Sequence, residues 1–599
     1  MLSQSIVAVT VAMATLVTNA QTIRENSTYT NPIIPGWNPD PSCTSVGDTV
    51  FCTTSSFSAF PGLPIYASKD LINWRLASNA FSRPDQVPEV ARYSGEDSGG
   101  LWASTLRERN GVFYLITAWV PRPEWGPIIL LFQTTDPFDD DAWSDPLRVD
   151  NPKNDIDPDL FWDTDGALYM AIAAGIWVSE LDLNKGIASE PFRIWNGTGD
   201  RNPEGPHFYL KDDYHYLVIG EGGTETNHTA TIARSQDGIK GPFVGYEGNP
   251  WLTNKFTSEY FQTVGHADLF QDANGNWWGI ALATRSGPEW DVYPMGRESV
   301  LFPVTWNENE WPVVDQIRGT MRGPLPPENL DVPGDGVWLE TPDVVDFEPG
   351  SALPRHLFFW RQPRLSDFEV SPEGHPNTLR ITPSRSNLTA IPGFVAQEEG
   401  LGFIARKQTS TLFDFSIDVS LARSSAVSSE AGVSVFLAHT QHLDLGIVHL
   451  PTNSSCNSTA PYFRLRIEAS GKGVPSPDPV IVPVPRKWRS ETIRLSLSAV
   501  SDTEYVFGAA LAAEPERVKH IGSADAWLVS GGAAPFTGKS RPLQSLEETH
   551  SELTCFQGTS LGIYATSNGG GDETPVYFSR WRYTPIAQKI DNDVLIPVL

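Results

Sequence analysis

Short apolar segments recur through the first half of the chain, and each directly follows a polar turn. They are rich in β-branched and aromatic side chains, a composition typical of strands. They cover residues 49–52, 112–117, 168–173, 214–219 and 277–281. The pattern repeats every 47 to 62 residues. A repeat of this length predicts a β-propeller with one four-stranded blade per repeat, hence five blades within residues 31–321.

The pattern changes after residue 345, where apolar and polar residues alternate strictly. Residues 413–421, 463–469 and 493–499 each show this period of two, which places the apolar side chains on one face of a strand. Such strands predict a two-sheet β-sandwich over residues 346–585. Residues 322–345 are rich in Pro, Gly, Asp and Glu and indicate a linker with little structure of its own. The predicted fold class is therefore all-β, a five-bladed propeller followed by a sandwich.

Five residues occupy equivalent places in the repeats, eight positions before each turn: Asp40, Trp102, Asp157, Glu204 and His266. The innermost strands of a propeller surround a central channel, so we expect these side chains to meet there. Three of them are carboxylates, a costly cluster unless one carboxyl stays protonated. An acid and a base on either side of a sugar are what glycoside hydrolysis requires, about 6.5–9.5 Å apart for an inverting reaction. The alternative for each Asp is an ordinary turn or cap.

The charge and the N-terminal residues indicate a secreted protein. The formal net charge of −29 argues against nucleic acid and anionic membranes as partners. Residues 1–20 have the short apolar run and small C-terminal residues of a secretory signal, and the run is too short to span a bilayer. Sequons for N-glycosylation, which fit an extracellular location, occur at Asn26, Asn196, Asn227, Asn387, Asn453 and Asn457.

The chain has four cysteines. An even number in a secreted chain favours disulfides, and we expect the pairs Cys43–Cys52 and Cys456–Cys555, each within one domain. The alternative is four free buried thiols. Their spacing supports no metal site.

Several motifs together resemble glycoside hydrolase family 43. They are residues 36–42 (Gly-Trp-Asn-Pro-Asp-Pro-Ser), 157–163, 204–207 (Glu-Gly-Pro-His) and 264–267 (Val-Gly-His-Ala), and the resemblance extends into a C-terminal concanavalin-like sandwich. It implies a five-bladed propeller and an inverting reaction. By motif, it makes Asp40 the general base, Glu204 the general acid, and Asp157 the residue that positions Glu204 and helps to keep it protonated.

The resemblance also implies residues that bind the sugar. Phe57, Trp102, Arg285 and Thr224 match positions that line the pocket, the alternatives being plain packing or a surface charge. This chain departs from the family where Ser104 replaces the usual proline after Trp102-Ala103, which puts that pocket wall in doubt.

The same resemblance bears on metal binding. His266 matches a histidine near the channel centre that contacts calcium or water in many family members; the alternative is a hydrogen-bonded core histidine. No cofactor is required, and the one metal expected is a structural calcium ion.

Within the family, residues 261–266, 284–289 and 293–298 resemble fungal arabinofuranosidases. The expected function is removal of α-L-arabinofuranosyl side chains from arabinoxylan, including doubly substituted xylose. One alternative is a β-xylosidase acting on xylo-oligosaccharides, because the two sugars present similar hydroxyl patterns. Another is a sugar-binding propeller without turnover. We expect a monomer whose partner is plant cell-wall arabinoxylan, with the sandwich as a structural partner of the propeller rather than a carbohydrate-binding module.

Overall fold

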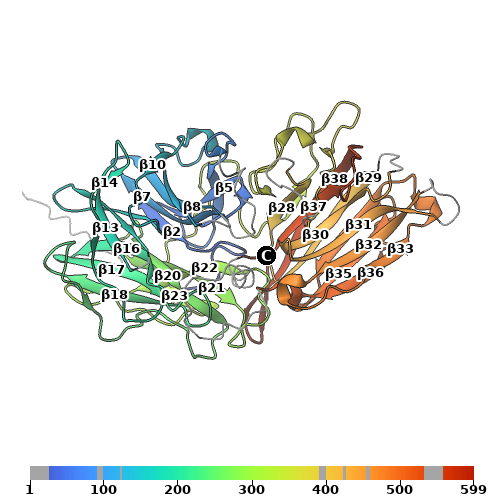
Figure 1. Cartoon of the computed structure of the whole chain (residues 1–599). Coiled ribbons are helices and arrows are strands. Elements are labelled where there is room, and N and C mark those ends of the chain that lie inside the picture. Colours follow the sequence, from blue (N-terminus) through green and yellow to red (C-terminus); the bar gives the residue numbers. More distant parts are fainter. Residues whose placement is uncertain are drawn as a thin grey trace, which may run out of the picture.

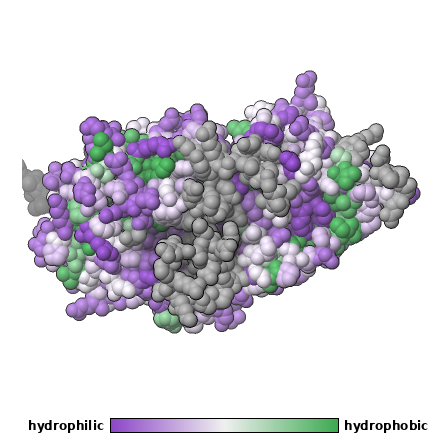
Figure 2. All heavy atoms as spheres, in the orientation of Figure 1, coloured by the Kyte–Doolittle hydropathy of each residue, from purple (hydrophilic) through white to green (hydrophobic). Residues whose placement is uncertain are grey.

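A computed structural model shows two β-rich domains side by side, with the C-terminal end of the chain between them (Figure 1). The structure describes residues 26–88, 90, 99–121, 125–173, 175–389, 400–421, 426–452, 459–531 and 557–598. In these residues no helix is both long and apolar enough to cross a bilayer. The face in Figure 2 is largely hydrophilic with small scattered hydrophobic patches, as expected for a strongly acidic chain.

The first domain consists of five antiparallel sheets arranged as blades, which confirms the predicted five-bladed propeller. The first blade contains β2 (Ser42–Val46), β3 (Thr49–Thr53), β5 (Gly62–Ser68) and β6 (Arg75–Phe81). The second contains β7 (Gly100–Arg109), β8 (Val112–Val120), β9 (Ile128–Thr134) and β10 (Leu147–Val149). The third contains β11 (Asp159–Trp162), β12 (Leu168–Ile172), β13 (Trp177–Asp182), β14 (Ile187–Ala188) and β15 (Phe192–Arg193). The fourth contains β16 (Glu204–Lys211), β17 (Tyr214–Glu221), β18 (Thr229–Ser235) and β19 (Val244–Gly245). The fifth contains β20 (Phe261–Gln271), β21 (Trp277–Arg285) and β22 (Arg297–Val304). Each predicted apolar segment is the second strand of its blade.

The N-terminal segment closes the propeller onto its last blade. β1 (Ser27–Thr30) pairs with β23 (Thr320–Gly323), and the amides of Ile33 and Ile34 donate to the carbonyl of Ser299 in β22. The fifth sheet has three strands rather than the predicted four, because the segment after β1 takes the place of a fourth strand with isolated backbone contacts.

The second domain is a sandwich of two large antiparallel sheets, as predicted. One sheet contains β24 (Asp343–Val345), β26 (Phe368–Val370), β27 (Leu379–Ile381), β29 (Leu412–Leu421), β34 (Ile493–Ala499), β35 (Glu504–Leu511), β36 (Lys519–Asp525), β38 (Val576–Asp591) and β39 (Val594–Pro597). The other contains β25 (Phe358–Trp360), β28 (Phe403–Lys407), β30 (Glu430–Ala438), β31 (Gln441–Pro451), β32 (Thr459–Glu468), β33 (Val480–Pro483) and β37 (Ser560–Thr566), with one strand added from the propeller. The short 3-10 helices are η1 (Asp140–Ala142), η2 (Leu365–Asp367), η3 (Ser470–Lys472), η4 (Arg486–Trp488) and η5 (Ala526–Val529).

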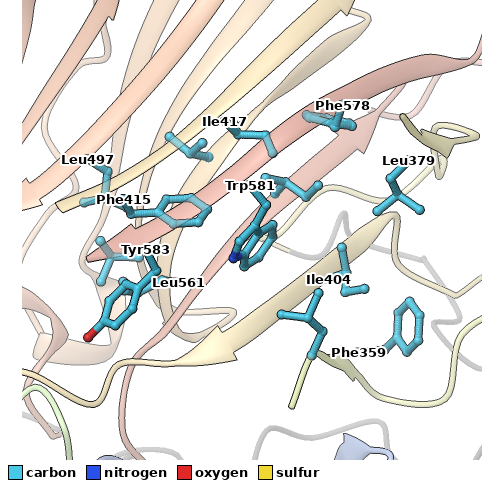
Figure 3. Close-up of a cluster of buried hydrophobic side chains, with 14 of the residues drawn as sticks. Phe359, Leu379, Ile404, Phe415, Ile417, Leu497, Leu561, Phe578, Trp581 and Tyr583 are labelled. Carbon is cyan, nitrogen blue, oxygen red and sulfur yellow. The ribbon is translucent and has the colours of Figure 1, made fainter. Parts of the chain in front are cut away.

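The alternating pattern becomes the sandwich core. In β34 the apolar residues are buried and the serines between them are partly exposed. Phe415 packs edge-on against Trp581 at 4.8 Å between ring centroids. Figure 3 shows these two side chains facing Ile404 and Phe359 of the opposite sheet.

Both domains contribute to two shared hydrophobic clusters and to one sheet. The added strand is β4 (Ala59–Phe60), which leaves the first blade to pair with β25. The largest cluster runs without a break from Leu101 of the propeller to Phe415 of the sandwich. The expected linker, residues 322–345, is also fastened to the first blade, because the amide of Leu339 donates to the carbonyl of Trp74.

One predicted disulfide is confirmed. Cys43 and Cys52 face each other across β2 and β3 and are bonded. Cys456 and Cys555 lie outside the described residues, as do residues 1–20.

Candidate active site

Each innermost strand contains or closely follows a residue with left-handed backbone geometry. The residues are Asp40 (φ 53°), Ala103 (φ 39°), Asp157 (φ 56°), Gly205 (φ 53°) and His266 (φ 46°). Residues other than glycine rarely adopt this conformation, and strained backbone of this kind clusters at functional sites. In β7, β16 and β20 the pairing register also shifts there.

In two blades the residue with left-handed geometry is not the one predicted to be equivalent to Asp40 but the residue after it. The left-handed position is occupied by Ala103 and Gly205, so Trp102 and Glu204 stand one residue earlier. The glutamate has one more methylene than an aspartate, so its carboxyl still reaches the cluster around Asp157 and Asp40, with which it interacts electrostatically.

Asp40 is a buried carboxylate held by fixed donors. Arg297 donates from Nη1 to Oδ1 at 3.0 Å, and the Ser55 hydroxyl donates to Oδ2 at 2.6 Å. His266 Nδ1 lies 3.7 Å from Oδ1. Burial alone would raise the pKa of Asp40. The electrostatic effects of Arg297 and His266, together with the hydrogen bond from Ser55, outweigh burial and lower the pKa below its usual value.

The second blade also supports Asp40. The amide of Ala103 donates a hydrogen bond to Ser55 Oγ at 2.6 Å, and the Ser55 hydroxyl in turn donates one to Asp40. Ser104, which replaces the family's usual proline, is hydrogen-bonded to Thr53 at 3.1 Å. The departure from the family pattern therefore lies in the contact between the first two blades.

Glu204 and Asp157 behave in the opposite way. Burial, together with repulsion from Asp40, raises the pKa of Glu204 to about 7 against the opposing charge of Arg297. Burial and repulsion from Glu204 and Asp40 raise the pKa of Asp157 as well. Asp157 accepts a hydrogen bond from the amide of Gly205 at 3.0 Å, which fixes the peptide that follows Glu204. The pair therefore keeps a proton to higher pH than ordinary carboxyls do.

His228 is a site residue that the sequence analysis missed. Its Nδ1 lies 3.0 Å from the carbonyl oxygen of Thr263 and its Nε2 lies 3.7 Å from Glu204 Oε1. A carbonyl only accepts, so Nδ1 carries the hydrogen and Nε2 presents a lone pair toward Glu204. Burial lowers the pKa of His228 to about 3, so the ring is neutral. Gly265 leaves room for it, because a Cβ there would lie 2.6 Å from the His228 ring.

The arginine that binds Asp40 is Arg297, whereas the predicted Arg285 binds Glu298. The guanidinium of Arg285 is buried against Glu298, with Nε 2.6 Å from Oε2, and donates to Gln588 of the sandwich at 2.7 Å. It fastens the fifth blade to β38 and lines a cavity between the two domains. Arg297 lies in the stretch 293–298 that the resemblance had already included, so a sequence signal for it existed.

Aromatic side chains cluster beside Arg297, whose guanidinium carbon lies 6.0 Å from the centroid of the Phe57 ring. Phe57 stacks on Trp37 with centroids 5.5 Å apart and contacts Trp102 at the same distance. The exposed Trp125 meets Trp102 at 6.4 Å between ring centroids, and Trp360 of the sandwich meets Trp37 at 6.1 Å. Phe57 and Trp102 therefore belong to one buried aromatic cluster, and their role in binding the sugar stays a prediction.

Thr224 takes a less definite place. It is half-buried in the loop between β17 and β18, and its role in binding stays a prediction.

Below the carboxylates, an arginine fills the channel. Arg107 binds Asp159 at 2.8 Å and Asp268 at 2.9 Å, and its Nη2 lies 3.0 Å from His207 Nδ1. An arginine only donates, so His207 Nδ1 accepts and its Nε2 carries the hydrogen, which prevents Nε2 from ligating a cation. The His207 ring lies 6.1 Å from that of His266. Over the described part of the chain, no three His, Cys, Asp or Glu side chains are arranged for a metal. The donor set does not fit the expected calcium ion.

Two family models match the chain domain by domain. The model "Glycosyl hydrolases family 43" matches residues 29–312. The model "Beta xylosidase C-terminal Concanavalin A-like domain" matches residues 344–584.

Individual relatives cover most of the chain. A protein of Bacteroides ovatus described as a non-reducing end alpha-L-arabinofuranosidase is 30% identical over 561 residues, 92% of this chain and 94% of that protein. A xylosidase/arabinosidase of Butyrivibrio fibrisolvens is 34% identical over 70% of this chain and 79% of its own. A solved structure of a Bacteroides ovatus protein, titled as family 43 and from a xyloglucan locus, has a TM-score of 0.76 at 29% identity and covers 94% of this chain and 100% of its own.

Proposed function

The chain belongs to glycoside hydrolase family 43, and from that premise we propose that it is an inverting α-L-arabinofuranosidase acting on arabinoxylan. The observation that supports the reaction is the contrast in protonation. Arg297 and Ser55 lower the pKa of Asp40, whereas burial raises that of Glu204 to about 7. Two carboxyls whose environments move their pKa values apart are suited to act as base and acid.

Asp40 is the proposed base. Its two oxygens each accept one hydrogen bond, from Arg297 and Ser55, and each retains a lone pair for water. Asp40 takes a proton from that water as the water oxygen bonds to the anomeric carbon. The bond from that carbon to the departing oxygen breaks on the opposite face of the sugar, so the released sugar has inverted configuration.

Glu204 is the proposed acid, which protonates the departing oxygen. Asp157 positions it through the Gly205 amide, and repulsion between the two carboxyls favours the protonated form. His228 adds a neutral ring whose Nε2 lone pair faces the Glu204 carboxyl at 3.7 Å and so favours its protonated form.

The names of the relatives support two substrates. The relative from Bacteroides ovatus carries the arabinofuranosidase name. The second-domain model is named for β-xylosidase, and another relative carries both names, which keeps an exo-acting β-xylosidase as the second candidate. The alternative of a non-catalytic propeller has no support in this family of enzymes.

The test is a paired assay. A nitrophenyl α-L-arabinofuranoside and a nitrophenyl β-xyloside are compared by kcat/KM, and the anomer released first is identified by proton NMR. We expect the arabinoside to be preferred and the product inverted. Preference for the xyloside would support the second candidate, and a retained anomer would contradict Asp40 as the base. Arabinoxylan oligomers with singly and doubly substituted xylose would then define the preference for branching.

We also propose that the protein is secreted and acts as a monomer. Three of the predicted glycosylation sites, Asn26, Asn196 and Asn227, are exposed. Expression in a eukaryotic host, followed by deglycosylation and gel filtration of the medium, tests this. A protein that stays in the cells without glycans would contradict it.

A further inference from the structure

The segment that carries Asp40 is held on one side by the fifth blade. The amide of Asn38, two residues before the proposed base, donates to the carbonyl of Arg297 at 3.0 Å. The hydroxyl of Ser299 donates back to the carbonyl of Asn38 at 2.7 Å. These bonds place the segment beside the arginine that binds Asp40.

The sandwich holds the same segment on its other side. Lys407, the last residue of β28, reaches into the propeller, and its Nζ donates to Asn38 Oδ1 at 2.6 Å. The next residue, Gln408, lies so close to Gly36 that a Cβ there would be 2.5 Å from its carbonyl oxygen. Residues 36–40 are thus enclosed between the two domains.

The Asn38 side chain connects these contacts. Its Nδ2 donates to the carbonyl of Pro35 at 2.9 Å, which fixes the amide plane. Its Oδ1 accepts from Tyr66 at 2.7 Å and Thr54 at 3.3 Å, in addition to Lys407. Of these three donors, Lys407 makes the shortest contact and is the one that comes from the sandwich domain.

The surroundings of Lys407 suit a fixed contact. It lines a cavity of about 60 Å³ between the domains, into which Asp343, His356, Arg355 and Arg406 also face. Asp343 is already bound by Arg406 at 2.8 Å and His356 at 3.1 Å. Burial lowers the pKa of Lys407 to about 7. Burying a lysine ammonium costs free energy, and its hydrogen bond to Asn38 offsets part of that cost.

We propose that Lys407 is a positioning residue through which the sandwich domain sets the geometry of Asp40. It acts through Asn38 and does not touch the sugar. This inference rests on the proposed role of Asp40. It assigns the second domain a part in catalysis besides packing.

The test compares three variants of the full chain. Lys407→Met removes the donor and retains an unbranched apolar side chain, whereas Lys407→Arg restores a charged donor. Lys589→Met is the matched control, because Lys589 is another half-buried sandwich lysine at the interface whose ammonium binds Asp502 at 2.6 Å. Small displacements of catalytic groups lower rates by up to about 10²-fold, so we expect kcat of Lys407→Met to fall on the order of 10- to 100-fold with little change in KM.

A second readout separates positioning from plain stability. If the segment relaxes, Arg297 and Ser55 bind Asp40 less well, and the acidic limb of the pH–rate profile moves to higher pH. Lys407→Arg should recover most of kcat, and Lys589→Met should show neither effect. Unchanged kcat in Lys407→Met, or a loss with an unmoved acidic limb, would overturn the inference. Wild-type enzyme inactive on both nitrophenyl sugars would instead overturn the proposed function.

Discussion

Asp40 and Glu204 share one buried cluster, yet each is surrounded by different groups. Two fixed donors hold the charge of Asp40, while Glu204 faces the neutral ring of His228 at 3.7 Å. The surroundings, rather than the residue type, therefore assign the two roles.

The leaving group separates the acid from the base. A sugar hydroxyl needs protonation as it departs, whereas a nitrophenolate needs little, and general-acid help is worth about 10²–10⁴-fold. Glu204→Ala should therefore lose about that factor in kcat/KM on arabinoxylan and much less on the nitrophenyl arabinoside. Asp40→Ala should suppress both. Equal losses on both substrates for Glu204→Ala would remove it from the role of acid.

The pH–rate profile should report the raised pKa of Glu204 and the lowered pKa of Asp40. Glu204 works protonated, and its pKa of about 7 places the alkaline limb of kcat/KM near neutral pH. Asp40 works ionised, and its lowered pKa places the acidic limb below the usual aspartate range. Asp157→Asn removes a repelling charge, so the alkaline limb should move to lower pH. A limb that stays in place would show that Asp157 does not raise the pKa of Glu204.

At this scale, part of the site could be predicted from sequence. Asp40, Asp157 and Glu204 carry a repeat signal, and the structure brings them into one electrostatic cluster. His228 carries none, because it lies just before β18, outside the innermost strands that repeat. The sequence points to Arg285, and only the fold shows that Arg297 is the guanidinium that meets Asp40.

At the scale of the strands, a network of hydrogen bonds and ion pairs connects the innermost strands of all five blades. Ser42, Arg107, Asp159, His207 and Asp268 come from β2, β7, β11, β16 and β20 in turn. Asp268 accepts from Ser42 at 2.7 Å as well as from Arg107. The second strands were predicted well because a buried run after a turn is a local pattern. The left-handed kinks were not, because Ala103 and Asp157 give no local sign of them.

Removing the arginine of this network tests its role as the fixed cation of the channel. Arg107→Met leaves Asp159 and Asp268 as buried charges without their partner, which typically destabilises a protein by about 3–5 kcal/mol. We expect a large fall in the urea midpoint for this variant.

The wild type should behave in a complementary way. It should show the same melting temperature with and without a chelator, and elemental analysis should find no calcium bound in stoichiometric amount. One calcium per chain, or a chelator-sensitive melting temperature, would contradict an arginine-filled channel.

Across the whole molecule, the two domains are less separate than their patterns indicate. The change from repeat to strict alternation predicts two domains. It does not predict that β4 pairs with β25, or that Arg285 and Lys407 cross between the domains. Such contacts join residues roughly 300 apart or more and leave no periodic signal in either segment.

Cutting the chain between the domains tests whether the sandwich is a structural partner. A propeller ending at residue 345 would expose the part of the shared cluster around Phe60 and Leu101 and the unpaired edge of β4. Apolar surface and open strand edges of this kind lead to aggregation, so we expect the fragment to be insoluble or inactive. Co-expression with residues 346–599 should recover soluble, active enzyme, since the interface needs no covalent link. A lone propeller with full activity on arabinoxylan would show that the second domain is dispensable for both folding and catalysis.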